Sequence, residues 1–504
     1  MPVFAAVDIG SNSVRLSIAE LRRGRLIPLH QDREVTRLGE SVFRDGSLNP
    51  QAMAHTLKVL RRFHRAVQSY AVERTRVVAT SALRDSVNGR LFAEWLKTVT
   101  GWKLEIITGL EEGRLIHLGV VSNLRALPSK LLLIDLGGGS CELTLSEKGH
   151  IKEIVTLPLG AVRLTQEFIR HDPPDKDELK RLRDFVVQEV AHVSRQIMRA
   201  DARTVIATSG TAAALAGAAQ SLRLTKGGVS RAVAAKLVKR LSKLTERQRA
   251  AIKGINPKRA QIIVAGATVY AHVLHACGLK GFRYSPLGLR DGILAQMAAE
   301  YDQHTRSHRQ LESDREDVLL RIARRYGVDL ENAQQVRGLA LTLFDHTRRV
   351  HGLNRDWREW IAAAAMLYEV GMFINPVGLH RHAYYVISRS ELFGFTPLQR
   401  TAIATVARFQ GNSRPQLRDR LIKLLPAQIR ADAIKATALL RVARSLNQGR
   451  RSAVHSLRAV VRAGEVIMTL KAGRGGADLE LWAGEKEVAY FREVFGRDLV
   501  FKLS

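Results

Sequence analysis

The stretch LLLIDLGGGSCEL, from Leu131 to Leu143, decides how this chain folds. It begins as an apolar run typical of a buried strand, reaches Asp135, and continues through three glycines and Ser140 to a second acid, Glu142. A glycine-rich turn presents several backbone N–H groups to one point and lets an anion approach without a Cβ in the way. The stretch therefore predicts a strand that leads into an anion-binding loop with a carboxylate on each side.

A second copy of this stretch lies near the start of the chain. VDIGSNSVRL matches IDLGGGSCEL position by position, which places Asp135 127 residues after Asp8 (135 − 8). VVATSA matches VIATSG in the same way, with Thr208 128 residues after Thr80 (208 − 80). Two motif pairs at nearly the same offset indicate two copies of one α/β unit.

The hydrophobic pattern divides the chain into four regions. Apolar runs alternate with amphipathic stretches over 1–125 and again over 126–300, as expected for helices that cover a mostly parallel sheet. Successive helical patterns follow over 318–450, after a charged linker at 301–317. Short alternating runs in 451–504 predict a small terminal α+β region.

Composition is that of a soluble globular protein, with 46% hydrophobic and 25% charged residues among 504. Two cysteines exclude a disulfide framework and a thiolate metal cluster. The N-terminal residues lack the pattern of a signal peptide, and the longest uncharged run breaks at a Ser-Gly-Thr turn. We therefore expect a cytoplasmic protein without membrane insertion.

The charge is strongly basic, because 79 Lys and Arg residues oppose 48 Asp and Glu residues and leave a formal charge of +31. Such an excess of positive charge raises the concentration of polyanions near the protein surface. Nucleic acid, an acidic membrane surface or a phosphate-rich small substrate would each satisfy it, as would a solvated basic surface with no dedicated partner. The chain contains no dedicated nucleic-acid motif.

Two facing glycine-rich loops would bind a phosphate chain from both sides. Carboxylates repel phosphate unless a cation intervenes, so Asp135 and Glu142 are interpreted as ligands of Mg²⁺ or another divalent cation, direct or through water. The alternative is that Asp135 caps the turn and Glu142 is a surface strand residue.

Hydrolysis also needs a base that deprotonates water, and ITGLEEGRLIHLGV offers Glu111 and Glu112 at the start of a helix. Both acids could instead favour the helix N-terminus electrostatically, and the residues alone leave this open. Arg84, in TSALRD, suits a bidentate phosphate contact or pairs with the neighbouring Asp85. The TSGTAA turn at Ser209 offers phosphate donors or a helix cap.

Seven motifs resemble the exopolyphosphatase / guanosine pentaphosphate phosphohydrolase family, a branch of the actin, sugar kinase and heat-shock chaperone superfamily. They occur in family order and span about residues 1–295: DIGSNSVRL, TSALRD, GLEEGRLIHLGV, DLGGGSCEL, LPLGAVRLT, TSGTAAALA and PLGLRDGIL. The resemblance implies an α/β fold with two duplicated actin-like (ribonuclease H-like) domains. An all-α HD-like domain and a small C-terminal α+β region would follow.

The resemblance also implies a metal-dependent phosphoanhydride hydrolase and, as its assembly, a homodimer. It gives Glu112 the role of the acid that activates water, and gives Asp135 and Glu142 the role of serving Mg²⁺. Asp8 and Arg15 are further site candidates. Phosphate binding is assigned to Gly10, Ser11, Asn12, Ser13, Arg84, Gly137, Gly138, Gly139, Ser140, Ser209, Gly210 and Thr211.

The expected reaction is hydrolysis of the terminal phosphoanhydride of inorganic polyphosphate with release of orthophosphate. The alternative within the family is pppGpp 5′-phosphohydrolase activity, which the sequence does not separate from it. An alternative from another class is a non-catalytic polyphosphate or nucleotide sensor.

The helical region resembles the HD-like domain of longer family members but departs from it at the ligand positions. Tyr368 and Glu369 stand where His-Asp is expected, Gln410 replaces a His, and Arg444 and Asn447 stand at acidic positions. Metal binding needs neutral His nitrogen and carboxylate oxygen. We therefore predict that this domain holds no catalytic metal, and that its basic helices line a channel for a long polyanion or form a dimer surface.

Overall fold

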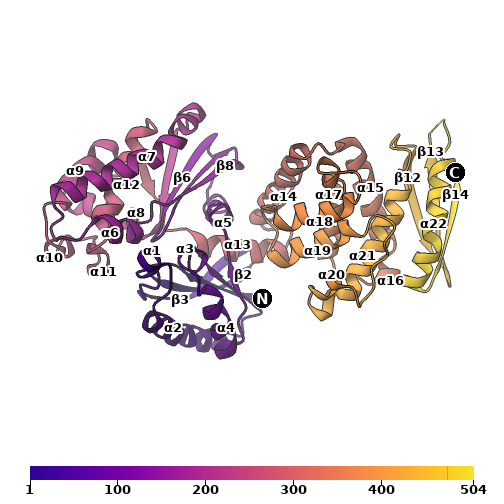
Figure 1. The fold of residues 1–504 in the computed structure, drawn as a ribbon, viewed down its shortest axis with the longest axis horizontal. Helices are drawn as coiled ribbons and strands as arrows, with labels where there is room; N and C mark the ends of the chain where they lie inside the picture. The colour runs from indigo at the N-terminus through magenta and orange to yellow at the C-terminus, as the bar shows by residue number, and fades with distance from the viewer. Residues whose placement is uncertain (474, 504) are drawn as a thin grey trace. The chain divides into compact units, whose positions relative to one another are not determined.

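The computed structural model describes residues 1–473 and 475–503. The chain divides into two compact units, Met1–Asp314 and Arg315–Ser504. The first unit contains two β-sheets with their helices, and the second begins with a run of helices and ends with a small sheet (Figure 1). The α/β fold class with a helical C-terminal region, predicted from the sequence, is confirmed.

Five strands form the first sheet, in the order β3-β2-β1-β4-β5. β1, β2 and β3 are antiparallel neighbours, whereas β1, β4 and β5 are parallel. The central β1 is buried along almost its whole length, as its apolar sequence predicts. The bounds are β1 Val3–Ile9, β2 Val14–Arg22, β3 Arg25–Glu34, β4 Arg74–Ala79 and β5 Leu104–Ile106.

Helices α2 (Pro50–Ser69) and α4 (Gly89–Thr100) lie together on one face of the first sheet (Figure 1). Asn49 caps α2 by accepting hydrogen bonds from two backbone N–H groups of its first turn. Leu60 and Phe63 of α2 are fully buried against the apolar side chains of this sheet. This packing forms the core of the first half.

Six strands form the second sheet, in the order β10-β11-β9-β6-β7-β8. β6, β7 and β8 are antiparallel neighbours, and β9 and β11 run parallel to β6. The bounds are β6 Lys130–Leu136, β7 Cys141–Glu147, β8 His150–Leu157, β9 Thr204–Thr208, β10 Val229–Ser230 and β11 Gly281–Tyr284. Its helices include α7 Lys176–Ala200, α8 Ser209–Ser221, α9 Arg231–Leu241 and α12 Ile263–Ala276, which share one large core with the sheet.

The duplication extends to the register of the strands. Asp8 lies opposite Arg15 in the β1–β2 ladder, and Asp135 lies opposite Glu142 in the β6–β7 ladder. The strand that leads to each Thr-Ser turn, β4 or β9, then pairs in parallel with the strand that carries the aspartate. The two halves therefore present their loops and acids from equivalent positions.

Two helices join the halves, α5 (Gly109–Val121) and α13 (Leu289–Tyr301). α5 packs on β7 and β8, α13 packs on β1 and β2, and the two helices pack against each other. At their crossing, a Cβ on Gly119 would lie 2.6 Å from the backbone nitrogen of Gly292, and a Cβ on Gly292 would clash with the carbonyl of Leu115. The helices therefore cross with their backbones in contact.

The first unit also contains several shorter helices. They are α1 Val42–Asp45, α3 Ser81–Arg84, α6 Ala161–Phe168, α10 Glu246–Ala250 and α11 Pro257–Ala260. Among the described residues, no helix is long and apolar enough to cross a membrane.

The charged segment 301–317, which we expected to be a linker, is largely helical. It belongs to α14 (Arg306–Arg325), and the boundary between the two units falls within this helix. Leu311 within the segment, and Val318 and Ile322 further along the same helix, are buried at the spacing of one helix face. The helix α14 therefore has an apolar stripe that the many charges of its first half obscured.

The second unit continues with helices and then a sheet in the order β12-β13-β14, beside α22. Its core is rich in small and aromatic residues, with Trp357 fully buried in α17. The helices are α15 Leu330–His346, α16 Arg348–His351, α17 Asp356–Leu367, the 3-10 turn Val370–Phe373, α18 Leu379–Arg389, α19 Pro397–Arg408, α20 Arg420–Lys423, α21 Ala427–Ser445 and α22 Asp478–Phe495. The strands are β12 Val454–Val461, β13 Glu465–Ala472 and β14 Asp498–Leu503.

Candidate active site

Three carboxylates converge where the second sheet meets α5. Glu112 comes from the first turn of α5, Asp135 from the end of β6, and Glu142 from the start of β7. One carboxylate oxygen of each lies within 4.8 Å of the others. At that separation, each pair of ionised carboxylates repels by roughly 3 kcal/mol at an effective dielectric constant of about 20.

Burial strengthens this repulsion and shifts the protonation of the three acids. Burial, together with the charge of Asp135, raises the pKa of Glu142 to about 8. Burial and the charges of Glu142 and Asp135 raise the pKa of Glu112 well above its ordinary value, and burial raises the pKa of Asp135. Without a cation, the cluster therefore holds protons near neutral pH.

The three acids fit a divalent cation. Both carboxylate oxygens of Glu142 and Oε2 of Glu112 are buried without a hydrogen-bond partner among the described residues. Asp135 accepts a hydrogen bond from the Thr208 hydroxyl through one oxygen. An all-oxygen set of ligands suits a hard cation such as Mg²⁺.

The packing of α5 distinguishes Glu112 from its neighbour. Glu111 accepts two hydrogen bonds from the guanidinium of Arg114, both 2.8 Å long, whereas Glu112 faces the acid cluster. A Cβ on Gly113 would lie 2.7 Å from Ile154 Cγ2 of β8, so the missing side chain lets α5 approach the sheet. This close approach brings Glu112 to Glu142.

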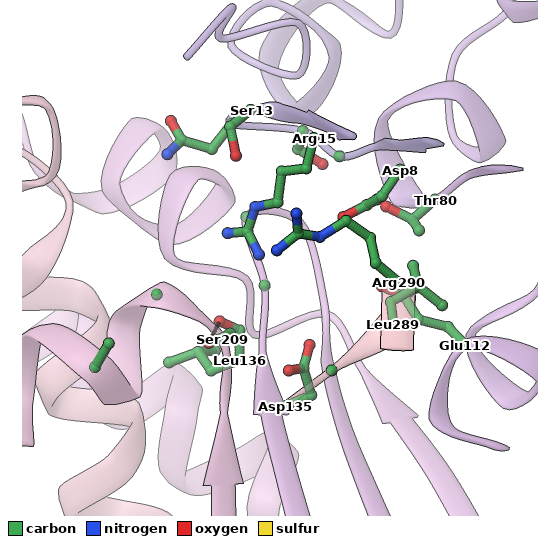
Figure 2. A pocket seen from close by; sticks show the side chains of 18 of the residues that line it. Asp8, Ser13, Arg15, Thr80, Glu112, Asp135, Leu136, Ser209, Leu289 and Arg290 are labelled. Carbon is green, nitrogen blue, oxygen red and sulfur yellow. Dashed lines mark hydrogen bonds between the residues drawn. The ribbon is translucent and has the colours of Figure 1, made fainter. Parts of the chain in front are cut away.

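The two predicted loops adopt the same turn. The Gly10 N–H donates to the Ser13 carbonyl at 3.1 Å, and the Gly137 N–H donates to the Ser140 carbonyl at 2.9 Å. Both loops line one pocket of about 250 Å³, shown in Figure 2. Of the predicted site residues, those lining it are Asp8, Gly10, Ser11, Asn12, Ser13, Arg15, Glu112, Asp135, Gly137, Gly138, Ser140, Ser209 and Gly210.

Three predicted phosphate-binding residues lie behind this lining. A Cβ on Gly139 would clash with Phe43 and Ser81, so the glycine packs against the first half of the molecule. The hydroxyl of Thr211 accepts a hydrogen bond from Arg259.

Arg84 donates from Nη1 to the Ile107 carbonyl at 3.0 Å. The same nitrogen lies 3.8 Å from Oε2 of Glu112. Arg84 therefore contacts the acid that we expected to be catalytic, rather than the pocket itself.

Four arginines line the same pocket, and three of them were not among the predicted site residues. Arg15 and Arg290 project into it, with Asp8 and Thr80 on one side and Asp135 and Ser209 on the other (Figure 2). Arg33 and Arg259 complete the group.

These arginines are close enough to affect one another. Burial, with the charges of Arg15 and Arg290, lowers the pKa of Arg33 to about 10. Burial, with the charges of Arg15 and Arg33, lowers the pKa of Arg259 to about 9. Like charges held together in a partly buried pocket favour the binding of a polyanion, which relieves their repulsion.

Two family models match the chain over most of its length. The model of the Ppx/GppA phosphatase family matches residues 17–301, and that of Ppx/GppA phosphatase domain III matches residues 315–475. This chain belongs to the Ppx/GppA phosphatase family. The predicted family resemblance is confirmed.

Named proteins and solved structures are similar to more than half of the chain. The chain is 34% identical over 313 residues to Exopolyphosphatase 2 of Mycobacterium tuberculosis, covering 58% of this chain and 98% of that protein. A crystal structure of the Aquifex aeolicus family member matches with 29% identity and a TM-score of 0.51, covering 60% of this chain and 99% of that one. An exopolyphosphatase from Cytophaga hutchinsonii matches with 26% identity and a TM-score of 0.55, covering 59% and 98%.

The sequence carried a partial signal for the additional arginines of this Ppx/GppA pocket. Arg290 lies in the PLGLRDGIL motif, and Arg33 pairs with Arg15 in the β2–β3 register, so a predicted hairpin would have placed it. Arg259 had no comparable signal. It reaches the pocket because Gly210 has no side chain, since a Cβ there would clash with the guanidinium.

Proposed function

We propose that this Ppx/GppA phosphatase is an exopolyphosphatase that hydrolyses the terminal phosphoanhydride of inorganic polyphosphate and releases orthophosphate. The observation that carries the proposal is that one pocket is lined by two acids of the carboxylate cluster, Glu112 and Asp135, and by four arginines, while the third acid, Glu142, lies within 4.8 Å of the other two. The acids are suited to a divalent cation, and the arginines are suited to a chain of phosphates. The name of the Mycobacterium tuberculosis relative supports the same substrate.

In this proposal the arginines hold the phosphate chain while the loops hold its end. The guanidinium groups of Arg15, Arg33, Arg259 and Arg290 offer charge-assisted hydrogen bonds to successive phosphates. The backbone N–H groups of the two glycine-rich loops bind oxygens of the terminal phosphate. Binding energy along the chain thus positions the terminal phosphorus for attack.

Glu112 is the proposed base. Its raised pKa suits proton transfer near neutral pH, and Arg84 at 3.8 Å stabilises the ionised form that accepts the proton. As water loses this proton, its oxygen forms a bond to the terminal phosphorus, and the bond to the bridging oxygen breaks. Mg²⁺, held by Asp135 and Glu142, would supply positive charge for the phosphate oxygens.

The test is a substrate comparison with the purified full chain and MgCl₂. Release of orthophosphate is measured from long-chain polyphosphate and from pppGpp, and kcat/KM is compared. Higher kcat/KM for polyphosphate is the expected result, whereas preference for pppGpp would assign the nucleotide phosphohydrolase activity instead. Binding without turnover under several divalent cations would overturn the enzyme assignment in favour of a sensor.

The homodimer implied by the family resemblance stays a prediction. Light scattering of the purified chain during size-exclusion chromatography measures the mass in solution and tests it directly.

A further inference from the structure

The motif LPLGAVRLT, residues 157–165, contributes no residue to the lining of the pocket. It leads into α6, and the first turn of this helix holds the second glycine-rich loop from behind. The N–H of Ala161 donates to the Gly137 carbonyl at 3.0 Å, and the N–H of Val162 donates to the Gly138 carbonyl at 2.8 Å. Two of the three glycine carbonyls are therefore held by the backbone of α6.

The side chain of Arg163 holds the third carbonyl of this loop. Its Nε donates to the Gly139 carbonyl at 2.8 Å. In a planar trans peptide the N–H points away from the C=O, so this contact turns the N–H of Ser140 away from α6. Arg163 thus fixes the direction of an N–H group in the loop proposed to bind the terminal phosphate.

The same guanidinium reaches the first half of the molecule. Nη2 of Arg163 donates to Oδ2 of Asp85, which directly follows α3. Cζ of Arg163 also lies 4.2 Å from the centroid of the Phe43 ring, so the cation is stacked on an aromatic face. Asp85 and Phe43 belong to the first half, whereas Gly139 belongs to the second. Arg163 therefore joins the two halves beside the loop.

Asp85 continues this connection towards the proposed base. Its Oδ1 lies 3.7 Å from Nε of Arg84. Nη1 of Arg84 lies 3.8 Å from Oε2 of Glu112, and it donates to the Ile107 carbonyl at 3.0 Å. Ile107 lies just before α5, the helix that carries Glu112. Charges of alternating sign thus lead from the loop, through Arg163 and Asp85, to the base.

The exposure of this ion pair indicates what it contributes. The side chains of Arg163 and Asp85 are 23% and 34% exposed, and an ion pair so open to water adds little to stability. A planar guanidinium that donates from two nitrogens to two fixed acceptors is nevertheless held in one orientation. The pair is therefore better suited to holding groups in place than to stabilising the fold.

We propose that Asp85 and Arg163 are positioning residues of the hydrolysis. Together they keep the base Glu112 at a fixed place relative to the second glycine-rich loop. Neither residue lines the pocket, so they act through Arg84 and the loop rather than on the substrate. The proposal rests on the role proposed for Glu112, because a displacement of reacting groups by about 1 Å can lower a rate about 100-fold.

The test measures kcat and KM of the full chain with MgCl₂ and with the better substrate of long-chain polyphosphate and pppGpp. Asp85→Asn should lower kcat about tenfold to 100-fold and change KM less than about threefold, since the residue aligns reacting groups without holding substrate. Asp85→Glu keeps the charge and should retain kcat within about threefold of the unchanged chain. Both variants should keep the Tm of the unchanged chain, which separates alignment from loss of folded protein.

A double variant tests whether the two residues act as one unit. Arg163→Gln should lower kcat as Asp85→Asn does, and the double variant should lose about as much as the slower single variant. Arg163→Lys, which offers one nitrogen for two acceptors, should show the same loss and replaces Arg163→Gln if that variant does not fold. Asp184→Asn is the matched control, because Asp184 pairs with Arg183 at 3.3 Å on the exposed surface of α7, and it should leave both constants unchanged.

Three results would overturn the proposal. They are losses that multiply in the double variant, equal losses in Asp85→Asn and Asp85→Glu, and a raised KM with an unchanged kcat. Failure of the base is a separate result, since full activity of Glu112→Gln would remove Glu112 from its role, whereas the coupling of Asp85 with Arg163 is measured with Glu112 intact.

Discussion

Glu142 lies directly opposite Asp135 in the β6–β7 ladder, where Glu142 is buried and Asp135 is partly buried. Opposed like charges are unfavourable on neighbouring strands. The pair therefore stores a repulsion that protons relieve at low pH and that a divalent cation would relieve at higher pH. The proposed exchange of protons for a metal ion predicts measurable effects of pH and of Mg²⁺ on the stability of the protein.

Stability of the metal-free protein should fall as the pH rises. The pKa of Glu142 is raised from 4.5 to about 8 in the folded state, so folding favours the protonated form. Its stabilising effect is fully present below about pH 4.5 and is lost as the pH rises towards 8, by at most about 5 kcal/mol. Thermal melting in EDTA between about pH 5 and about pH 9 measures this loss as a decrease in Tm.

Glu142→Gln should flatten that dependence on pH, and Glu147→Gln, an exposed change on the same strand, should leave it unchanged. Addition of MgCl₂ at about pH 8 should raise the Tm of the unchanged chain and not that of Glu142→Gln. Equal pH profiles for the unchanged chain and Glu142→Gln would contradict the prediction.

Glu112→Gln should lower kcat for polyphosphate by about 100- to 10,000-fold, the usual contribution of a general base. The amide keeps the shape of the side chain but cannot accept the proton from water. KM should change little, because the phosphate chain is held by other residues. Phosphate release from polyphosphate measures both constants, and activity near that of the unchanged chain would remove Glu112 from the role of base.

Arg259→Gln should weaken substrate binding about tenfold to 100-fold, as expected for loss of a charged hydrogen bond in a partly buried pocket. The dependence of KM on salt concentration should become shallower, since fewer charges contribute. Arg231→Gln, an exposed change at the start of α9, is the matched control. Equal KM values and equal salt dependence in the two variants would exclude Arg259 from substrate binding.

Gly113→Ala should lower kcat more than it raises KM. The added Cβ would lie 2.7 Å from Ile154 Cγ2, so α5 must move away from the sheet that carries Glu142. Such overpacking typically costs about 1–3 kcal/mol. Ile154→Ala in the same chain removes the contact and should restore part of kcat; a double variant no better than Gly113→Ala would contradict this explanation.

The loops and the duplicated strands were accessible from the sequence because each lies within one short motif. Asp135, its glycines and Glu142 all fall within residues 135–142, and strand pairing alone places the two acids together. The choice between Glu111 and Glu112 was not accessible, because it depends on Arg114, which engages one acid and leaves the other facing the cluster. Only the family resemblance favoured Glu112 beforehand.

The arginines of the pocket, unlike the loops, do not lie within one short motif. Arg33 lies on a strand, Arg259 on a short helix and Arg290 at the start of α13, so their meeting depends on the three-dimensional arrangement of distant segments. The helical structure of segment 301–317 escaped prediction for a different reason. Its charges dominate its composition, whereas the few buried residues that make it a helix are widely spaced.

The crossing of α5 and α13 has a consequence for the geometry of the pocket. Glu112 lies at the start of one helix and Arg290 at the start of the other, and the helices touch through backbone atoms at Gly119 and Gly292. Their separation is therefore set by peptide groups, which cannot change rotamer, rather than by side chains, which can. A methyl group added at either glycine would therefore push apart the helix that carries the proposed base and the helix that carries Arg290.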